Sequence, residues 1–190
     1  MEAYIIDGFR SPVGKAPRGV FRFTRPDDLA ADVIRHLLQQ HPEIDPSRVD
    51  DLIVGNAVPE ADQGMQMARY ISLLALGKEV PGITINRYCG SGVEAVAMAV
   101  GKIRSGMADI VIAGGTESMS LVPTTGYKTA LNYEIATAHP DYYIGMGLTA
   151  EQVAQKYKIS REEQDEFAYQ SHQKALNAQK EGYFDSGIVP

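Results

Sequence analysis

The stretch Ile83-Thr84-Ile85-Asn86-Arg87-Tyr88-Cys89-Gly90-Ser91-Gly92-Val93-Glu94-Ala95-Val96 changes its hydrophobic pattern partway along. Residues 83–86 form a short run typical of a buried strand. From Val93 onward, apolar residues recur at helical spacing as far as Ile103, and Gly106 marks the end of that helix. The stretch therefore predicts a strand that leads directly into a helix, with Cys89 at the junction.

Strand and helix patterns also alternate on both sides of this stretch. Residues 3–6, 52–54 and 110–113 are predicted strands, and helical patterns follow Pro26 and span residues 67–76. Strands that alternate with helices of this length are joined by parallel crossovers. We therefore predict an α/β fold with a parallel-dominated sheet and helices on both of its faces.

Beyond Met119 the sequence becomes rich in Pro, Gly and Tyr and poor in aliphatic residues, which indicates an excursion from the sheet. Two helices are predicted after it, at about residues 150–157 and 161–180. Each is preceded by a hydroxyl residue with Gln or Glu three positions later, Thr149 with Gln152 and Ser160 with Glu163, which is the capping-box pattern.

The composition is that of an ordinary globular protein, with 190 residues, 44% hydrophobic and 22% charged. A formal net charge of -6 and the lack of a basic run argue against nucleic acid as a partner. The single cysteine cannot form an internal disulfide, which indicates a reducing compartment. The start of the sequence does not resemble a leader, and no apolar run is long enough to span a bilayer. We therefore expect a cytoplasmic protein with no membrane partner.

Cys89 lies where the helix dipole is positive, and this position favours thiolate over thiol. Gly90 and Gly92 allow a sharp turn and keep the approach to the sulfur open, so that the Cys89 N–H can donate to a developing oxyanion. The pattern indicates a nucleophile. The competing interpretation is a small buried apolar residue, which is the commoner role of a lone cysteine.

A second alternative is a dinucleotide-binding turn, because Gly90-x-Gly92-x-x-Ala95 follows a predicted strand and opens a helix. Such a site needs an acidic residue about 20 positions later, at the end of the next strand, to bind the ribose. Asp109 lies at the start of that strand and Glu117 lies beyond it, so neither fits well.

Residues 85–96 resemble the acyl-enzyme segment of thiolases at each position that can be compared. Further stretches resemble the same family in the same order: Arg10-Ser11-Pro12-Val13-Gly14-Lys15, Ala113-Gly114-Gly115-Thr116-Glu117-Ser118-Met119-Ser120, Gly145-Met146-Gly147-Leu148-Thr149-Ala150-Glu151 and Ser160-Arg161-Glu162-Glu163-Gln164-Asp165-Glu166-Phe167-Ala168. The likeness covers nearly the whole chain and ends halfway through a typical member.

Thiolases have two similar α/β halves, with a loop domain inserted in the first. The resemblance therefore implies that residues 1–118 are most of the N-terminal half, that residues 119–190 begin the inserted loop domain, and that the C-terminal half is absent. It also implies an acyl-CoA C-acyltransferase in which Cys89 carries the acyl group and its N–H binds the oxyanion. Coenzyme A would be a substrate, and no cofactor or metal is implied.

The rest of a thiolase site consists of a second cysteine, a histidine and an asparagine-held water, which come from the other half. The 190-residue chain alone is thus expected to be catalytically incomplete, and the complete protein to be a homodimer. A less close relative is a fatty-acid condensing enzyme, and a different class is a non-catalytic fragment or assembly module.

The resemblance also places Met146 and Gly145 in the acyl pocket. Short-chain biosynthetic thiolases have a histidine directly before this Met-Gly pair, where the present sequence has Gly145. A smaller residue leaves room for an acyl chain longer than acetoacetyl. The simpler interpretation is that glycine serves the turn into the next helix.

Overall fold

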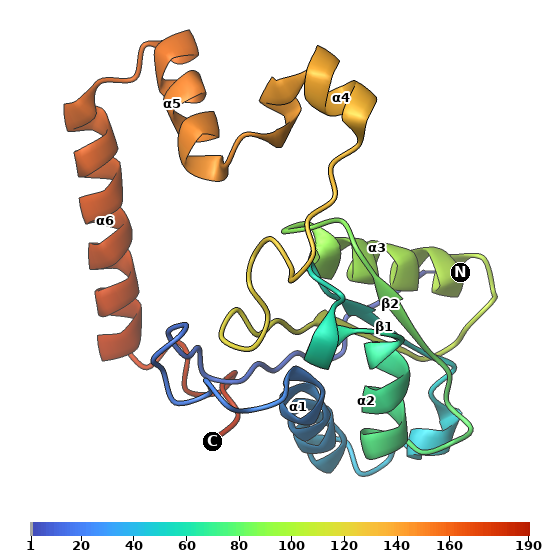
Figure 1. Ribbon diagram of the computed structural model, residues 1–190. Helices are drawn as coiled ribbons and strands as arrows, with labels where there is room; N and C mark the ends of the chain where they lie inside the picture. The colour runs from blue at the N-terminus through green and yellow to red at the C-terminus, as the bar shows by residue number, and fades with distance from the viewer. Residues whose placement is uncertain (1) are drawn as a thin grey trace. The chain divides into compact units, whose positions relative to one another are not determined.

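The computed structural model describes residues 2–190, which form two compact units (Figure 1). The first comprises the chain up to Lys128 together with Gly187–Pro190, and the second is Thr129–Ser186. Residues 119–128 belong with the first unit, because Val122 is buried and the Tyr127 N–H donates to Glu60 at 2.6 Å. The break between the two compact units thus follows Lys128, and the family domain boundary after Ser118 stays a prediction.

The first unit contains a three-stranded parallel sheet with the order β2-β1-β3. Its strands are β1 (Asp51–Gly55), β2 (Gly82–Ile85) and β3 (Val111–Gly115). Ile53 of β1 stands opposite Ile83 on one side and Ala113 on the other. All five residues of β1 are buried, as expected for a strand covered on both faces.

Three helices cover the two faces of this sheet (Figure 1). On one face, α1 (Pro26–Gln40) and α2 (Met67–Ala75) pack against Leu52 and Val54. On the other, Ala95 and Ala99 of α3 (Ser91–Arg104) pack against Ile53. Successive residues of a strand point to opposite faces, so one apolar strand supports both layers. The predicted α/β fold is confirmed.

The second unit contains α4 (Tyr133–Ala138), the 3₁₀ turn η3 (Pro140–Tyr143), α5 (Met146–Tyr157) and α6 (Arg161–Lys180). The first unit also contains two 3₁₀ turns, η1 (Pro46–Arg48) and η2 (Ala61–Gln63). The capping box of Ser160 and Glu163 is confirmed at the start of α6. The one predicted at Thr149 is wrong, because α5 begins earlier and the Thr149 hydroxyl donates to the Gly145 carbonyl at 3.2 Å inside the helix.

The predicted strand at residues 3–6 is also not formed. The segment is unpaired, and the exposed fractions of Ile5 and Ile6 are 83% and 75%. It is held further along, where the Arg10 N–H donates to Gly187 at 3.0 Å and Val189 donates to Arg10 at 2.9 Å. An apolar pattern produces a strand only where a partner edge is within hydrogen-bonding reach. A cavity of about 520 Å³ separates this segment from β3.

His41, which follows α1, fastens the same N-terminal segment through an ionic contact. Its Nε2 lies 3.0 Å from an Asp7 oxygen and its Nδ1 lies 3.3 Å from a Glu43 oxygen. These two hydrogen bonds, that of Asp7 above all, raise the pKa of His41, while His41 lowers the pKa of Asp7. The contact is therefore strongest at a pH between the two pKa values.

We predict that the Arg10 amide, which donates to the Gly187 carbonyl, loses protection as the pH rises through the raised pKa of His41. A raised folded-state pKa stabilises the folded form below the unfolded value of about 6.5 and stops doing so above the folded value. Hydrogen exchange, corrected for the intrinsic effect of pH, measures this loss. His41→Gln should abolish the pH dependence, whereas His36→Gln, which removes an imidazole packed on Phe9, should retain it. An unchanged pH dependence in His41→Gln would contradict the assignment.

Candidate active site around Cys89

Cys89 lies between the end of β2 and the start of α3, as the sequence predicted. Gly90 is the N-cap residue of α3, and the helix begins at Ser91. The thiol is exposed, so the alternative of a small buried apolar residue is wrong. An exposed sulfur beside a helix N-terminus is accessible to a substrate carbonyl and lies near the positive end of the helix dipole.

Tyr88, directly before the cysteine, has a left-handed backbone with φ of 46°. Its N–H donates to Asn86 Oδ1 at 2.8 Å, and its carbonyl accepts from the Ser91 hydroxyl at 2.6 Å. The same hydroxyl accepts from the Arg87 N–H at 2.9 Å. The turn that carries Cys89 is therefore held by a side chain on each of its two sides.

The glycines around this turn differ in how much space a Cβ would find at each position. A Cβ on Gly55, at the end of β1, would lie 2.5 Å from the Ser91 carbonyl carbon, so this glycine allows α3 to approach the sheet. A Cβ on Gly92 would meet nothing within 4 Å, in keeping with an open approach. On Gly90 it would lie 3.3 Å from the Arg87 carbonyl oxygen, which is tight.

Side chains tie the loops after β1 and β3 to the Cys89 turn. The Glu117 carboxylate accepts from the Ala57 N–H at 2.7 Å and from Gln63 Nε2 at 2.6 Å. The Ala57 carbonyl in turn accepts from Asn86 Nδ2 at 3.0 Å. The carboxylate of Glu117, a poor fit for a ribose ligand by sequence, is thus occupied by hydrogen bonds to other residues of the chain.

Sequence reasoning missed three of these residues, Asn86, Ser91 and Gln63. Gln63 is fully buried and also accepts from the Ser118 N–H. The available signal was their position, because Asn86 directly follows a strand and the loops beyond the carboxyl ends of parallel strands meet at one edge of a sheet.

The other predicted site residues, Gly145 and Met146, belong to the second unit, whereas Cys89 belongs to the first. Gly145 is the N-cap of α5, and the exposed fraction of Met146 is 72%. Gly145 has φ of −68° and ψ of 158°, which any residue adopts, and a Cβ there would meet nothing within 4 Å among the described residues. The turn into α5 therefore does not require glycine.

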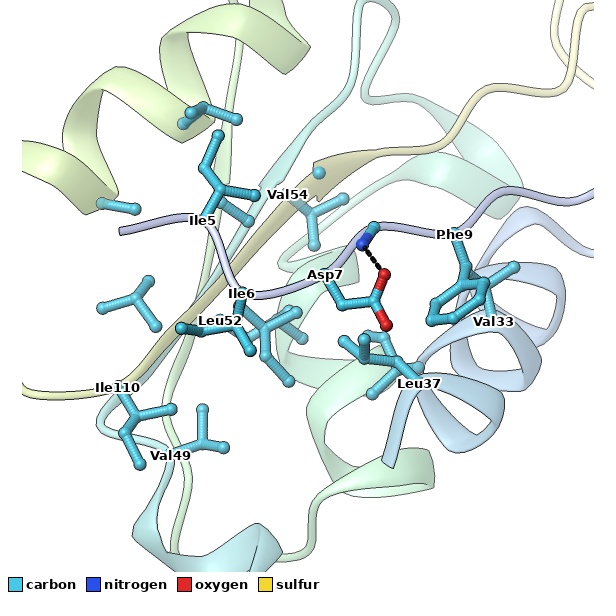
Figure 2. A pocket seen from close by; sticks show the side chains of 18 of the residues that line it. Ile5, Ile6, Asp7, Phe9, Val33, Leu37, Val49, Leu52, Val54 and Ile110 are labelled. Carbon is cyan, nitrogen blue, oxygen red and sulfur yellow. Dashed lines mark hydrogen bonds between the residues drawn. The ribbon is translucent and has the colours of Figure 1, made fainter. Parts of the chain in front are cut away.

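A cavity of about 520 Å³ lies elsewhere in the first unit, and Cys89 is not among its lining residues. Figure 2 shows Ile5 and Ile6 of the N-terminal segment facing it, together with Val33 and Leu37 of α1. The unpaired edge of β3 forms another wall. Ile112 of β3 packs on one face of the sheet and Val111 on the other, so β3 is apolar on both faces like a central strand.

The described residues contain no group of three or more His, Cys, Asp and Glu side chains that could hold a metal ion. None of the helices in this part of the chain combines the length and the apolar character that crossing a membrane requires.

Comparison with known proteins gives consistent matches along the chain. A family model described as "Thiolase, N-terminal domain" matches residues 3–190. The 3-ketoacyl-CoA thiolase of Bacillus subtilis (strain 168) is 51% identical over 190 residues, which cover 100% of this chain and 48% of that protein. The 3-ketoacyl-CoA thiolase of Aliivibrio salmonicida (strain LFI1238) is 43% identical, with coverage of 98% and 48%.

A solved structure gives the same result for the fold. The crystal structure of the Bacillus anthracis acetyl-CoA acetyltransferase aligns with a TM-score of 0.80 and 35% identity, over 96% of this chain and 48% of that one. The chain thus spans about half the length of the curated relatives it matches. Because the family model matches almost every residue, the chain belongs to the thiolase family, and the match is to the N-terminal domain of that family.

Proposed function

We propose that the complete protein is an acyl-CoA C-acyltransferase in which Cys89 carries the acyl group. The observation that supports this most is the exposed cysteine at the strand-to-helix junction of a chain that the thiolase family matches over residues 3–190. The relatives at 51% and 43% identity bear the name 3-ketoacyl-CoA thiolase.

In the proposed reaction, the Cys89 thiolate attacks the 3-keto carbon of a 3-ketoacyl-CoA. The bond between the second and third carbons then breaks, and its electron pair leaves with acetyl-CoA, which takes up a proton. The acyl group remains on the sulfur as a thioester, until the thiolate of a second coenzyme A displaces it as acyl-CoA. The reverse sequence condenses two thioesters. The N–H of Cys89 stabilises the oxyanion that develops during each attack.

The chain supplies only part of this machinery. Its sequence contains one cysteine, so a second cysteine for proton transfer has to come from residues outside it. We propose that a second half, in the same polypeptide or a separate one, completes the site. The apolar cavity beside the unpaired edge of β3 supports this, because a paired and covered sheet does not end on a strand that is apolar on both faces.

We also propose that the complete protein is a homodimer. Tyr70, Leu73 and Leu74 of α2 are exposed apolar residues next to the edge strand β2, and such a surface suits contact with another chain. The alternative function, a non-catalytic fragment or assembly module, is favoured only by the length of the chain relative to its relatives.

We predict that acetyl-CoA leaves an acetyl group on Cys89 of the complete protein and that Cys89→Ala abolishes acyl transfer, because the proposed reaction carries the acyl group on this sulfur. Peptide mass mapping under turnover locates the adduct. Ser105→Ala, at the opposite end of α3, is the matched control and should keep both properties. Turnover without an adduct at Cys89 would rule out this role.

The 190-residue chain alone should turn over substrate at least about 10²-fold more slowly than the complete protein, because it lacks the proton-transfer group. Mixing it with a separately produced second half should restore activity in a thiolysis assay. Ile6→Asp should prevent this restoration, because Ile6 lines the cavity, while Val13→Asp should not, although both side chains are exposed in the chain alone. Full activity of the chain by itself would refute the proposal.

The preferred substrate should carry an acyl chain longer than acetoacetyl. Each further buried methylene adds about 0.8 kcal/mol of binding where there is room for it. We expect Gly145→His to lower kcat/KM for an eight-carbon ketoacyl-CoA relative to a four-carbon one, since the structure leaves space at residue 145 and does not need glycine there. Gly101→His, at another open glycine, is the control. A four-carbon preference that Gly145→His does not change would contradict this.

A further inference from the structure

We propose that Asn86 and Ser91 are positioning residues for Cys89, which hold the preceding residue, Tyr88, in its left-handed conformation. This inference rests on the proposed function of Cys89 as the nucleophile. It concerns how the chain fixes the direction of that nucleophile before any substrate binds.

The conformation of Tyr88 needs support from its surroundings. Its φ of 46° is unfavourable for a residue with a Cβ, because the side chain approaches the following carbonyl. Such a conformation persists only where neighbouring contacts over-determine it. Tyr88 itself offers none by packing, since its exposed fraction is 74%. The support therefore comes from hydrogen bonds to its backbone.

Asn86 supplies the support on the strand side. Its Oδ1 accepts from the Tyr88 N–H at 2.8 Å, while its Nδ2 donates to the Ala57 carbonyl at 3.0 Å. Ala57 is itself held, because its N–H donates to the Glu117 carboxylate at 2.7 Å. The Asn86 amide thus connects the Cys89 turn to the loops that follow two other strands.

Ser91 supplies the support on the helix side. Its buried hydroxyl donates to the Tyr88 carbonyl at 2.6 Å and accepts from the Arg87 N–H at 2.9 Å. The backbone of Ser91 cannot move toward the sheet, because it already packs against Gly55. The carbonyl of Tyr88 belongs to the peptide that leads into Cys89, so its orientation determines where the thiol points.

The consequence for Cys89 is electrostatic. The positive end of a helix dipole acts only within the first turn, so a thiolate benefits from α3 only while the turn keeps it beside Gly90 and Ser91. If Tyr88 relaxes to a right-handed or extended backbone, the sulfur moves away from the N–H groups of that turn. Loss of either support should therefore change how the sulfur is presented and lower its reactivity.

The test is the rate of alkylation of Cys89 by iodoacetamide at neutral pH, measured on the 190-residue chain, in which no other cysteine reacts. Asn86→Ala and Ser91→Ala should each lower this rate about two- to fivefold. Asn177→Ala, at an exposed asparagine of α6, should react like the unaltered chain.

A role confined to stability would lower the melting temperature and leave the alkylation rate of the folded variant unchanged, and that result would overturn the proposal. Asn86→Ser, which keeps an acceptor for the Tyr88 N–H, should fall between Asn86→Ala and the unaltered chain, and it provides the comparison if Asn86→Ala does not fold. Acetylation of Cys89 by acetyl-CoA is measured in a separate experiment on the complete protein. Its absence refutes the proposed function, whereas unchanged alkylation rates refute only the positioning role.

Discussion

The backbone of Ser91 packs against Gly55 at the end of β1, and the geometry of the Cys89 turn depends on this close approach. A Cβ on residue 55 would lie 2.5 Å from the Ser91 carbonyl carbon, so a larger residue would force α3 away from the sheet. Since β1 is buried along its whole length, the strand has no room to move instead. The core of the first unit thus fixes the start of α3, and the start of α3 fixes the turn that carries the cysteine.

The edge of the sheet formed by β3 lacks such a constraint. β3 packs on α3 through Val111 and Ala113, while Ile110 and Ile112 pack against the cluster formed with α1 and α2, yet one of its edges has no partner strand. Edge strands of finished sheets are short, charged or covered. The unpaired N-terminal segment has the same apolar character and faces the same cavity. Both segments therefore have the composition of buried strands without the neighbour that would bury them.

Much of this fold could be predicted from periodicity, and the exceptions share a physical cause. The helix at Arg161–Lys180 and the three strands of the sheet lie where local patterns placed them. Residues 3–6 do not form a strand, because pairing depends on a partner edge that no local pattern reveals. Thr149 fails as a cap because its hydroxyl found an acceptor four residues back within the helix, which competes with capping.

The candidate site also has one part that the local sequence predicts and another that it does not. Cys89 was predictable from its place between a strand and a helix and from the long resemblance around it. The side chains that tie its turn to the neighbouring loops were not, because Asn86, Gln63 and Glu117 come from three separate connections that only the folded sheet brings together. In sequence, each of them is an ordinary polar residue.

The proposed chemistry has two requirements, a correctly directed nucleophile and a group that transfers protons, and different parts of the protein meet them. The direction of the nucleophile is set by hydrogen bonds that residues 55–118 make among themselves, and these are complete in the chain as it stands. Proton transfer to and from the sulfur requires a group that these residues lack. Preorganisation of the nucleophile is therefore a property of the first unit, whereas turnover is a property of the complete protein. A change in one can leave the other intact, because they depend on different parts of the polypeptide.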